Sequence, residues 1–295
     1  MRRFAGHFYQ SAAIYAGQQG FMNDRLAPFQ QTVLTRNNVQ VRGQGASTLV
    51  FAHGFGCDQN MWRFVAPAFE RNHRIVLFDY VGCGKSDLSA FEAGRYASLD
   101  GYARDLVEVC EALELRGATL VGHSVSAMVG VLGALRQPSL FSRLVMVGPS
   151  PRYINEAPDY FGGFEREDIE GLLSLMDLNY IGWAGTLAPM VMGHPQQPGL
   201  ARELEESFCS TDPKAAKLFA RATFFADNRA DIEQMTLPSL ILQVRDDAIA
   251  PIQVGEYMHR RMPNSTLAIL EASGHCPHMS HPEETIDAIR RFLEG

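Results

Sequence analysis

The sequence predicts an α/β fold with a mostly parallel central sheet, helices on both of its faces and a helical insertion. Two observations support this prediction. Short apolar runs that fit buried strands alternate with longer segments of helical periodicity, as in a parallel sheet covered on both sides. The alternation stops over residues 151–227, where the pattern is helical throughout. A chain of 295 residues, 46% of them hydrophobic, can form one core with such an insertion.

The beginning of the chain gives the weakest structural signals. Residues 1–31 are expected to form a loosely ordered extension. Met1-Arg2-Arg3 and the apolar residues that follow resemble a signal peptide, but polar residues interrupt the apolar stretch, so an export signal is not favoured. Met22 is an alternative start. Residues 32–41 read as a β-hairpin around the polar turn Arg36-Asn37-Asn38.

Two stretches, residues 32–150 and 228–295, carry the alternating strands and helices of the core. Strands are expected at short apolar runs, at 48–52, 74–78, 118–121, 144–147, 240–244 and 267–270. Helices are expected at about 60–69, 99–113, 127–135, 251–258 and 282–293. Strands that alternate with helices in this way favour parallel pairing, through right-handed crossovers.

Residues 151–227 are expected to form a helical lid over the carboxyl ends of the strands. Four helices are predicted there, at 165–176, 179–192, 200–208 and 212–227. The segment is rich in aromatic residues, most of which would pack between lid helices while some face a cavity beneath them. The predicted pocket residues are His53, Trp183 and Phe224. Such an apolar, nearly closed pocket suits a small hydrophobic ester, lactone or similar carbonyl compound.

One serine lies in a motif that points to chemistry. Ser124 is the centre of Gly122-His123-Ser124-Val125-Ser126, between a predicted strand and a predicted helix. A serine on such a sharp turn presents its Oγ to a histidine and to substrate, which is the nucleophile elbow of α/β-hydrolases. The usual pattern ends in glycine, and Ser126 is a mild departure because serine is also small. The alternative interpretation is a small-residue turn with an incidental serine.

An acid and a histidine follow in the order that this fold requires. A serine nucleophile needs a histidine as base, and that histidine needs a carboxylate to orient it. Asp247 and His275 each follow a predicted strand, at the sheet edge where ligands bind in open α/β sheets. The predicted triad is therefore Ser124, Asp247 and His275. Asp246 is the rival acid, and we prefer Asp247 because it is placed in the loop before the next helix.

Two backbone amides are candidates for the oxyanion hole. One belongs to Val125, the residue after the nucleophile, and the other to the loop after strand 48–52. That loop reads His53-Gly54-Phe55-Gly56, and its glycines allow the Phe55 N–H to point into the site. An ordinary glycine-rich loop is the alternative interpretation.

Composition excludes several classes of function. A net charge of −7 and the lack of a basic stripe argue against nucleic acid as a partner. No apolar run reaches the length of a membrane span. The five cysteines are scattered and odd in number, which indicates reduced thiols and a cytoplasmic location. His275, His278 and His281 resemble metal ligands in spacing, but prolines at 277 and 282 separate them, so neither a metal nor a cofactor is predicted.

From about residue 32 to its end, the chain resembles the RsbQ-like regulators of bacterial stress responses. The shared runs include GFGCDQ at 54–59, NYIGWA at 179–184 and GHCPHMSHP at 274–282. The resemblance extends to the plant strigolactone and karrikin receptors, whose elbow also reads GHSVSA. It implies a lidded α/β-hydrolase with a Ser-His-Asp triad, slow turnover of a small apolar ligand and a role in signalling. The implied partner is a PAS-domain PP2C-type phosphatase that activates a stress sigma factor.

Three hypotheses therefore remain open. The protein is a hydrolase-based regulator of stress signalling, a metabolic carboxylesterase or lactonase, or a ligand-binding module whose hydrolysis is vestigial. A neighbouring gene for a PAS-domain phosphatase favours the first, and a catabolic operon favours the second. Loss of ester hydrolysis on replacing Ser124 separates both enzymes from the third.

Overall fold

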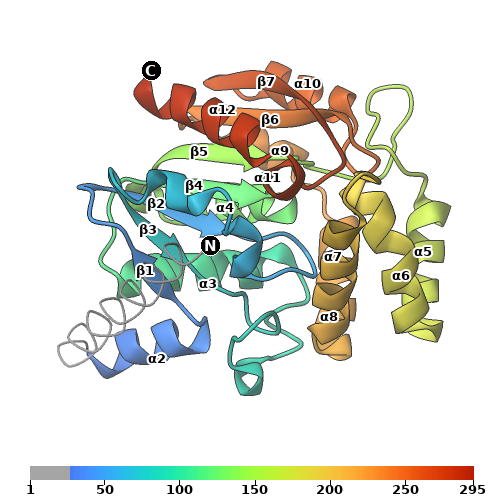
Figure 1. Cartoon of the computed structure of the whole chain (residues 1–295), viewed down its shortest axis with the longest axis horizontal. Coiled ribbons are helices and arrows are strands. Elements are labelled where there is room, and N and C mark those ends of the chain that lie inside the picture. Colours follow the sequence, from blue (N-terminus) through green and yellow to red (C-terminus); the bar gives the residue numbers. More distant parts are fainter. Residues whose placement is uncertain (1–26) are drawn as a thin grey trace, which may run out of the picture.

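Residues 27–295 are described by the computed structural model and form a seven-stranded sheet between helices (Figure 1). Most of the expected extension, residues 1–26, lies outside them. The strand order is β1-β3-β2-β4-β5-β6-β7, and only the β1–β3 pair is antiparallel, which confirms the predicted α/β fold. The strands span Gln40–Arg42 (β1), Ser47–Ala52 (β2), His73–Leu77 (β3), Ala118–His123 (β4), Phe141–Val147 (β5), Ser239–Asp246 (β6) and Ser265–Ser273 (β7).

Helices cover both faces of this sheet. Helices α3, α4 and α10 pack on one face, and α12 packs on the other. Adjacent strand residues such as Val50 and Phe51 belong to opposite cores, because side chains alternate along a strand. With both faces buried, the strands read as unbroken apolar runs. The core helices span Pro28–Arg36 (α2), Leu99–Ala112 (α3), Val125–Arg136 (α4), Arg229–Glu233 (α9), Ile252–Arg261 (α10), Pro277–Ser280 (α11) and Pro282–Glu294 (α12).

The structure corrects the expectation for residues 28–41. No hairpin forms there, and residues 28–31 belong to helix α2, which starts with a proline at its first position. Val33 is buried, and Arg36 pairs with Glu108 of α3 (Nη2–Oε2, 2.7 Å). These contacts with the core outweigh the strand propensity of the valine and threonines. The strand after the turn, β1, pairs with β3 instead.

The helix expected at 60–69 is also different. Two short 3-10 helices, η1 (Gln59–Trp62) and η2 (Ala66–Phe69), occupy this stretch. Pro67 explains the break, because it has no N–H to donate to the carbonyl four residues earlier. The resulting turn buries Trp62 completely against the sheet.

Four further helices stand together beside the sheet (Figure 1). In sequence they lie between β5 and β6, in the stretch where a helical insertion is predicted. None of the helices in residues 27–295 is long and apolar enough to cross a membrane. The insertion helices span Arg166–Leu178 (α5), Tyr180–Met192 (α6), Pro198–Ser210 (α7) and Pro213–Phe224 (α8).

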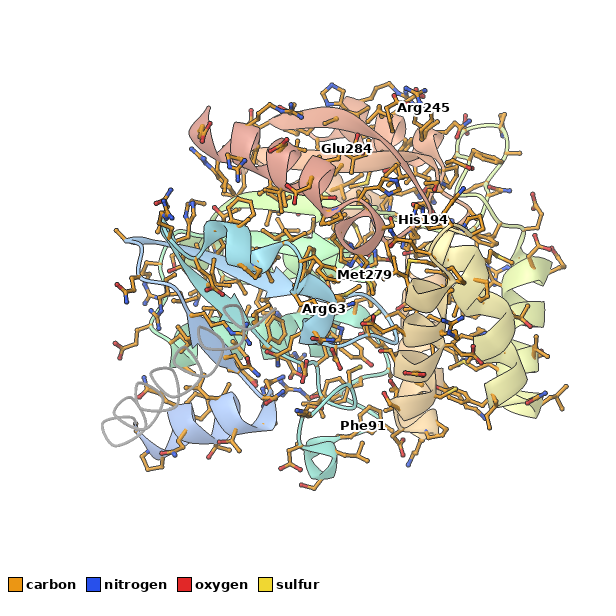
Figure 2. All side chains as sticks on the ribbon, in the orientation of Figure 1. Arg63, Phe91, His194, Arg245, Met279 and Glu284 are labelled. Carbon is orange, nitrogen blue, oxygen red and sulfur yellow. The ribbon has the colours of Figure 1, made fainter. Side chains whose placement is uncertain are left out.

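Direct contacts attach these helices to the core. Arg63, labelled in Figure 2, pairs with Glu203 of α7 (Nη2–Oε2, 2.6 Å). The backbone N–H of His275 donates to the carbonyl of Val191 near the end of α6 (2.8 Å). Gly193 ends α6 with a φ of +55°, and a Cβ on it would lie 2.5 Å from the Cα of the residue before His275. Helix α6 therefore lies directly against the loop that carries this histidine.

Candidate active site

Ser124 lies at the junction of β4 and α4 in a strained backbone conformation. Its φ is +55° and its ψ −121°, a region that non-glycine residues rarely adopt. Its N–H donates to the carbonyl of Val147 on β5 (2.8 Å), and its carbonyl accepts from the N–H of Ala127 (2.9 Å). The neighbouring strand and the first turn of α4 therefore hold the strained turn in place.

Three side chains from distant parts of the sequence form a chain of hydrogen bonds here. His275 Nε2 lies 2.7 Å from Ser124 Oγ, and His275 Nδ1 lies 2.8 Å from Asp247 Oδ2. All three residues are buried. The bonds assign the tautomer: Nδ1–H donates to the carboxylate, and Nε2 accepts from the serine hydroxyl. This is the arrangement in which a histidine can take the proton of a serine.

The structure distinguishes between the two neighbouring aspartates. Asp246 ends β6 with its side chain exposed, whereas Asp247 turns inward. The second carboxylate oxygen of Asp247, Oδ1, accepts from the N–H groups of Ile249 (2.8 Å) and Ala250 (3.1 Å). These bonds orient the carboxylate toward the histidine. The preferred acid is therefore the one that contacts His275.

Both candidate oxyanion donors are available. Val125 is the first residue of α4, where a helix leaves its N–H groups without partners inside the helix. Within residues 27–295, neither the Val125 N–H nor the Phe55 N–H donates a hydrogen bond to another group. Buried amides seldom stay unpaired. Two free amide donors beside a serine can stabilise negative charge on a carbonyl oxygen.

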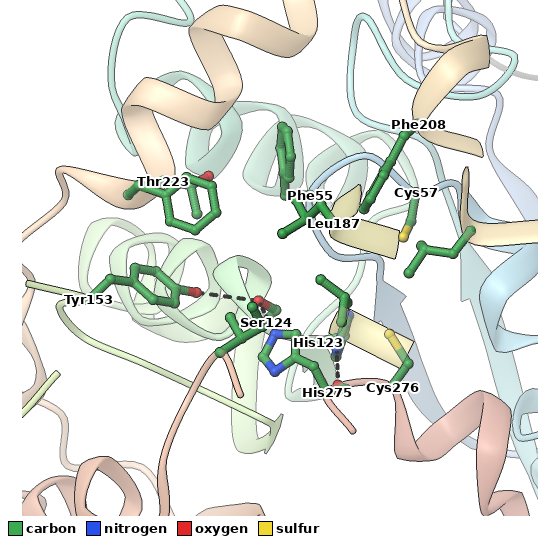
Figure 3. Close-up of a pocket in the computed structure, with 14 residues that line it drawn as sticks. Phe55, Cys57, His123, Ser124, Tyr153, Leu187, Phe208, Thr223, His275 and Cys276 are labelled. Atoms are coloured by element: carbon green, nitrogen blue, oxygen red, sulfur yellow. Dashed lines mark hydrogen bonds between the residues drawn. The ribbon is translucent and has the colours of Figure 1, made fainter. Parts of the chain in front are cut away.

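A small apolar cavity of about 30 Å³ adjoins the triad (Figure 3). The Tyr153 hydroxyl lies 3.3 Å from Ser124 Oγ within it, and burial raises the pKa of Tyr153 to about 12, so that it stays protonated. Thr223 also lines it, and its hydroxyl has no partner in the described chain. The complete lining is Phe55, Cys57, His123, Ser124, Tyr153, Leu187, Val191, Leu204, Phe208, Thr223, Phe224, Ile249, His275 and Cys276.

Of the predicted pocket residues, the structure places only Phe224 in the cavity wall. Trp183 is buried behind the wall, with its ring against Phe208 and Phe55 (centroids 5.3 and 6.0 Å apart). His53 is buried beneath the loop after β2, where its ring is bonded to backbone groups. The predictions that Trp183 and His53 line the pocket are therefore wrong. Phe208 and Phe55 stand between Trp183 and the small cavity, and backbone hydrogen bonds hold the His53 ring elsewhere.

Sequence reasoning missed Tyr153 and Thr223 as cavity residues. Tyr153 comes six residues after β5 ends, at the same sheet edge as the triad. This position after a strand end is the sequence signal from which Tyr153 could have been predicted to line the cavity. Thr223 occupies the last turn of α8, and only the packing of helices α5–α8 decides that this helix face meets the cavity.

A second group of buried side chains lies next to the triad. Within residues 27–295, His123, Cys276 and His278 each place one ligand atom within 4.8 Å of the other two, so this group could hold a metal. It is a different group from the one considered in the sequence, which was His275, His278 and His281. His123 Nε2 donates to the carbonyl of His275 (2.8 Å). Burial lowers the pKa of His278 to about 3 and that of His123 well below its usual value. Burial also raises the pKa of the Cys276 thiol. The group is therefore uncharged.

Fold and geometry define a class of protein, and the comparisons agree with it. Residues 49–288 match the alpha/beta hydrolase family, and the chain belongs to that family. The karrikin insensitive 2 receptor IA of Petunia hybrida is 38% identical over 256 residues, which cover 86% of this chain and 93% of the receptor. Strigolactone esterase D14 of Arabidopsis thaliana is 36% identical over 265 residues, covering 90% and 98%. A hydrolase from Oleispira antarctica has a solved structure with a TM-score of 0.88 and 46% identity, covering 90% and 97%.

Proposed function

We propose that this protein is a serine hydrolase that cleaves small hydrophobic esters or lactones with the triad Ser124, His275 and Asp247. The observation that supports it most is the continuous hydrogen-bonded chain from the Ser124 hydroxyl through His275 to the Asp247 carboxylate. The strained φ of Ser124 adds support, because such strain persists where the surrounding structure enforces it and is concentrated at active sites.

The proposed reaction has two halves. Ser124 Oγ attacks the substrate carbonyl while its proton passes to His275 Nε2, and the carbonyl oxygen becomes an oxyanion that accepts from the Phe55 and Val125 N–H groups. The intermediate collapses to an acyl-serine, and the proton on His275 moves to the departing alkoxide. A water molecule then gives a proton to His275 Nε2 as its oxygen attacks the acyl carbon. When this second intermediate collapses, the acid is released and the proton on His275 returns to Ser124 Oγ. Asp247 stays ionised and stabilises the imidazolium in each half.

The cavity argues for a small, uncharged substrate. Within residues 27–295, no lysine, arginine or carboxylate side chain lines it, so a charged substrate would lose hydration without gaining a partner of opposite charge. Its volume of about 30 Å³ is far below the roughly 300–1,000 Å³ of pockets that hold drug-sized ligands. A substrate therefore needs the wall to move, and the Phe55 ring is one point where lid and core meet. It contacts rings from three lid helices, those of Trp183, Phe208, Phe219 and Phe224. Displacement of this packing makes turnover slow.

The finer part of the proposal is a signalling role like that of the RsbQ-like regulators, with a PAS-domain PP2C-type phosphatase as partner. The similarity to relatives named as receptors supports it. The five unpaired cysteines support a cytoplasmic location. A metabolic carboxylesterase or lactonase is the second candidate, which the similarity to a relative named as an esterase favours.

The mechanism is tested with p-nitrophenyl acetate. The wild-type protein should hydrolyse it, and Ser124→Ala should lower kcat by a factor on the order of 10⁴–10⁶. A fluorophosphonate probe should label the wild type at Ser124 and leave the variant unlabelled. Equal rates for the two proteins would rule out the serine mechanism.

The signalling role needs a separate assay. Addition of the wild-type protein to a purified PAS-domain PP2C-type phosphatase should raise its rate of phosphate release, and Ser124→Ala should do so less or not at all. A protein that cleaves small esters at the ordinary enzymatic kcat of about 10 s⁻¹ and leaves the phosphatase unchanged is a metabolic esterase.

A further inference from the structure

A closed network of buried hydrogen bonds lies beneath the loop that carries Phe55. Ser126 Oγ donates to the carbonyl of His53, and the Tyr80 hydroxyl lies 2.8 Å from Ser126 Oγ. The Tyr80 backbone N–H donates to His53 Nε2 (3.2 Å). His53 Nδ1 in turn donates to the carbonyl of Gly54 (2.8 Å). The side chains of His53, Tyr80 and Ser126 are fully buried, so water does not compete for these bonds.

The network connects the three strands around the nucleophile at their carboxyl ends. His53 follows β2, Tyr80 comes after β3, and Ser126 lies in the first turn of α4, directly after β4. Ser126 stands where the usual elbow pattern has glycine, and glycine could not make this link. Burial lowers the pKa of His53, against the pull of Asp79, and keeps the ring neutral. A neutral ring can accept at Nε2 while it donates from Nδ1, as the network requires.

These bonds fix the peptide that offers one oxyanion donor. The Gly54–Phe55 peptide is trans, because the one cis bond in residues 27–295 is at Pro158. In a planar trans peptide the carbonyl and the next N–H point in opposite directions. His53 and the Cys57 N–H (3.3 Å) both hold the Gly54 carbonyl from one side. The Phe55 N–H is therefore directed away from the His53 ring, and it is the amide that donates to no group of the described chain.

We propose that His53, Tyr80 and Ser126 are positioning residues for the oxyanion hole, which hold the Phe55 N–H ready to bind the developing oxyanion. This inference rests on the proposed serine mechanism. Preorganised donors stabilise a transition state because they need no reorientation during the reaction. Loss of one link loosens the hold of His53 on the Gly54–Phe55 peptide, and part of that stabilisation is then lost.

Two substitutions that each remove one hydroxyl oxygen test the network. Tyr80→Phe and Ser126→Ala should each lower kcat for p-nitrophenyl acetate on the order of 10- to 100-fold, less than the 10²–10³ expected for loss of a donor itself. KM should change less than about threefold, because the ester carbonyl binds weakly before it becomes an oxyanion. A trifluoromethyl ketone, which forms a tetrahedral adduct with the serine, should lose affinity by the same factor as kcat.

The matched control is Tyr96→Phe. Tyr96 is equally buried, and its hydroxyl donates to Asp105 (2.9 Å) rather than to a group of the network. This variant should lower Tm and leave kcat and ketone affinity at wild-type values.

His53→Asn, whose amide can replace the Nδ1 donor, should retain more activity than His53→Leu.

The outcomes separate the two proposals. If Tyr80→Phe and Ser126→Ala lower Tm as Tyr96→Phe does, but keep wild-type kcat and ketone affinity, the network is structural only and the positioning role is wrong. If Ser126→Ala does not fold, Tyr80→Phe alone decides. If the wild-type protein neither hydrolyses the ester nor reacts with a fluorophosphonate, the serine mechanism fails, and the positioning role fails with it.

Discussion

Acid should destabilise this protein through histidines buried around the active site. His53, His123 and His278 are at most 2% exposed, and burial lowers the pKa of each. The clearest case is His278, whose pKa is lowered to about 3, while a histidine in the unfolded chain titrates near 6.5. Between these pH values the unfolded chain binds a proton that the folded protein does not. The stabilisation is therefore complete above about pH 6.5 and is lost as the pH falls toward 3.

The magnitude follows from proton linkage. Each histidine that charges only on unfolding lowers the free energy of unfolding by about 1.4 kcal/mol per pH unit in this range. His123 and His278, whose pKa values are lowered furthest, together contribute about 2.7 kcal/mol per pH unit once the pH is a full unit or more below 6.5. A folded protein is stable by only about 5–15 kcal/mol, so the loss accumulated between pH 6 and pH 4 is a large fraction of the total.

Urea unfolding at pH 7, 6 and 5, followed by tryptophan fluorescence, measures this slope. His278→Gln removes one titrating group and should reduce the slope between pH 6 and 5 by about 1.4 kcal/mol per unit. His259→Gln, at an exposed histidine of α10, is the control for the substitution itself. If His278→Gln has the slope of the wild type, His278 is not the buried neutral group described here.

Three further predictions concern the triad, the lid and the cavity. Asp247→Asn should lower kcat for p-nitrophenyl acetate by a factor on the order of 10³–10⁴, whereas Asp246→Asn should stay within about twofold; the opposite ranking would reverse the choice of acid. Gly193→Ala should lower the free energy of unfolding by about 1–3 kcal/mol in urea titrations, because its Cβ would meet backbone at 2.5 Å. Gly171→Ala on α5, where a Cβ meets nothing within 4 Å, should raise the free energy of unfolding by about 0.5–1 kcal/mol. Equal changes in the two variants would contradict the close contact described for Gly193. Thr223→Val should raise the free energy of unfolding by about 1 kcal/mol, because it removes a buried hydroxyl that has no hydrogen-bond partner among residues 27–295. A lower free energy of unfolding would mean that the hydroxyl is paired.

Local sequence patterns were sufficient for the fold and for the order of the reactive residues. The strands are unbroken apolar runs, because a parallel sheet is buried on both faces, and such runs are visible without any tertiary information. The elbow around Ser124 is a local strand–turn–helix motif, and the acid and base follow strand ends, which a parallel sheet brings to one edge. Pro67 is a local signal as well, because a proline inside the helix expected at 60–69 interrupts it.

Tertiary structure decided what depends on neighbours far away in sequence. Residues 32–35 have strand propensity and still form a helix, because Arg36 finds its partners on α3. The cavity wall includes Tyr153 and Phe224 but not Trp183, because the packing of the aromatic side chains of α5–α8 settles which ring faces inward. His53 is a scaffold residue because Ser126 and Tyr80 meet it in space. Periodicity reports only whether a side chain is buried. Which partner it meets there depends on how helices and loops distant in sequence pack together.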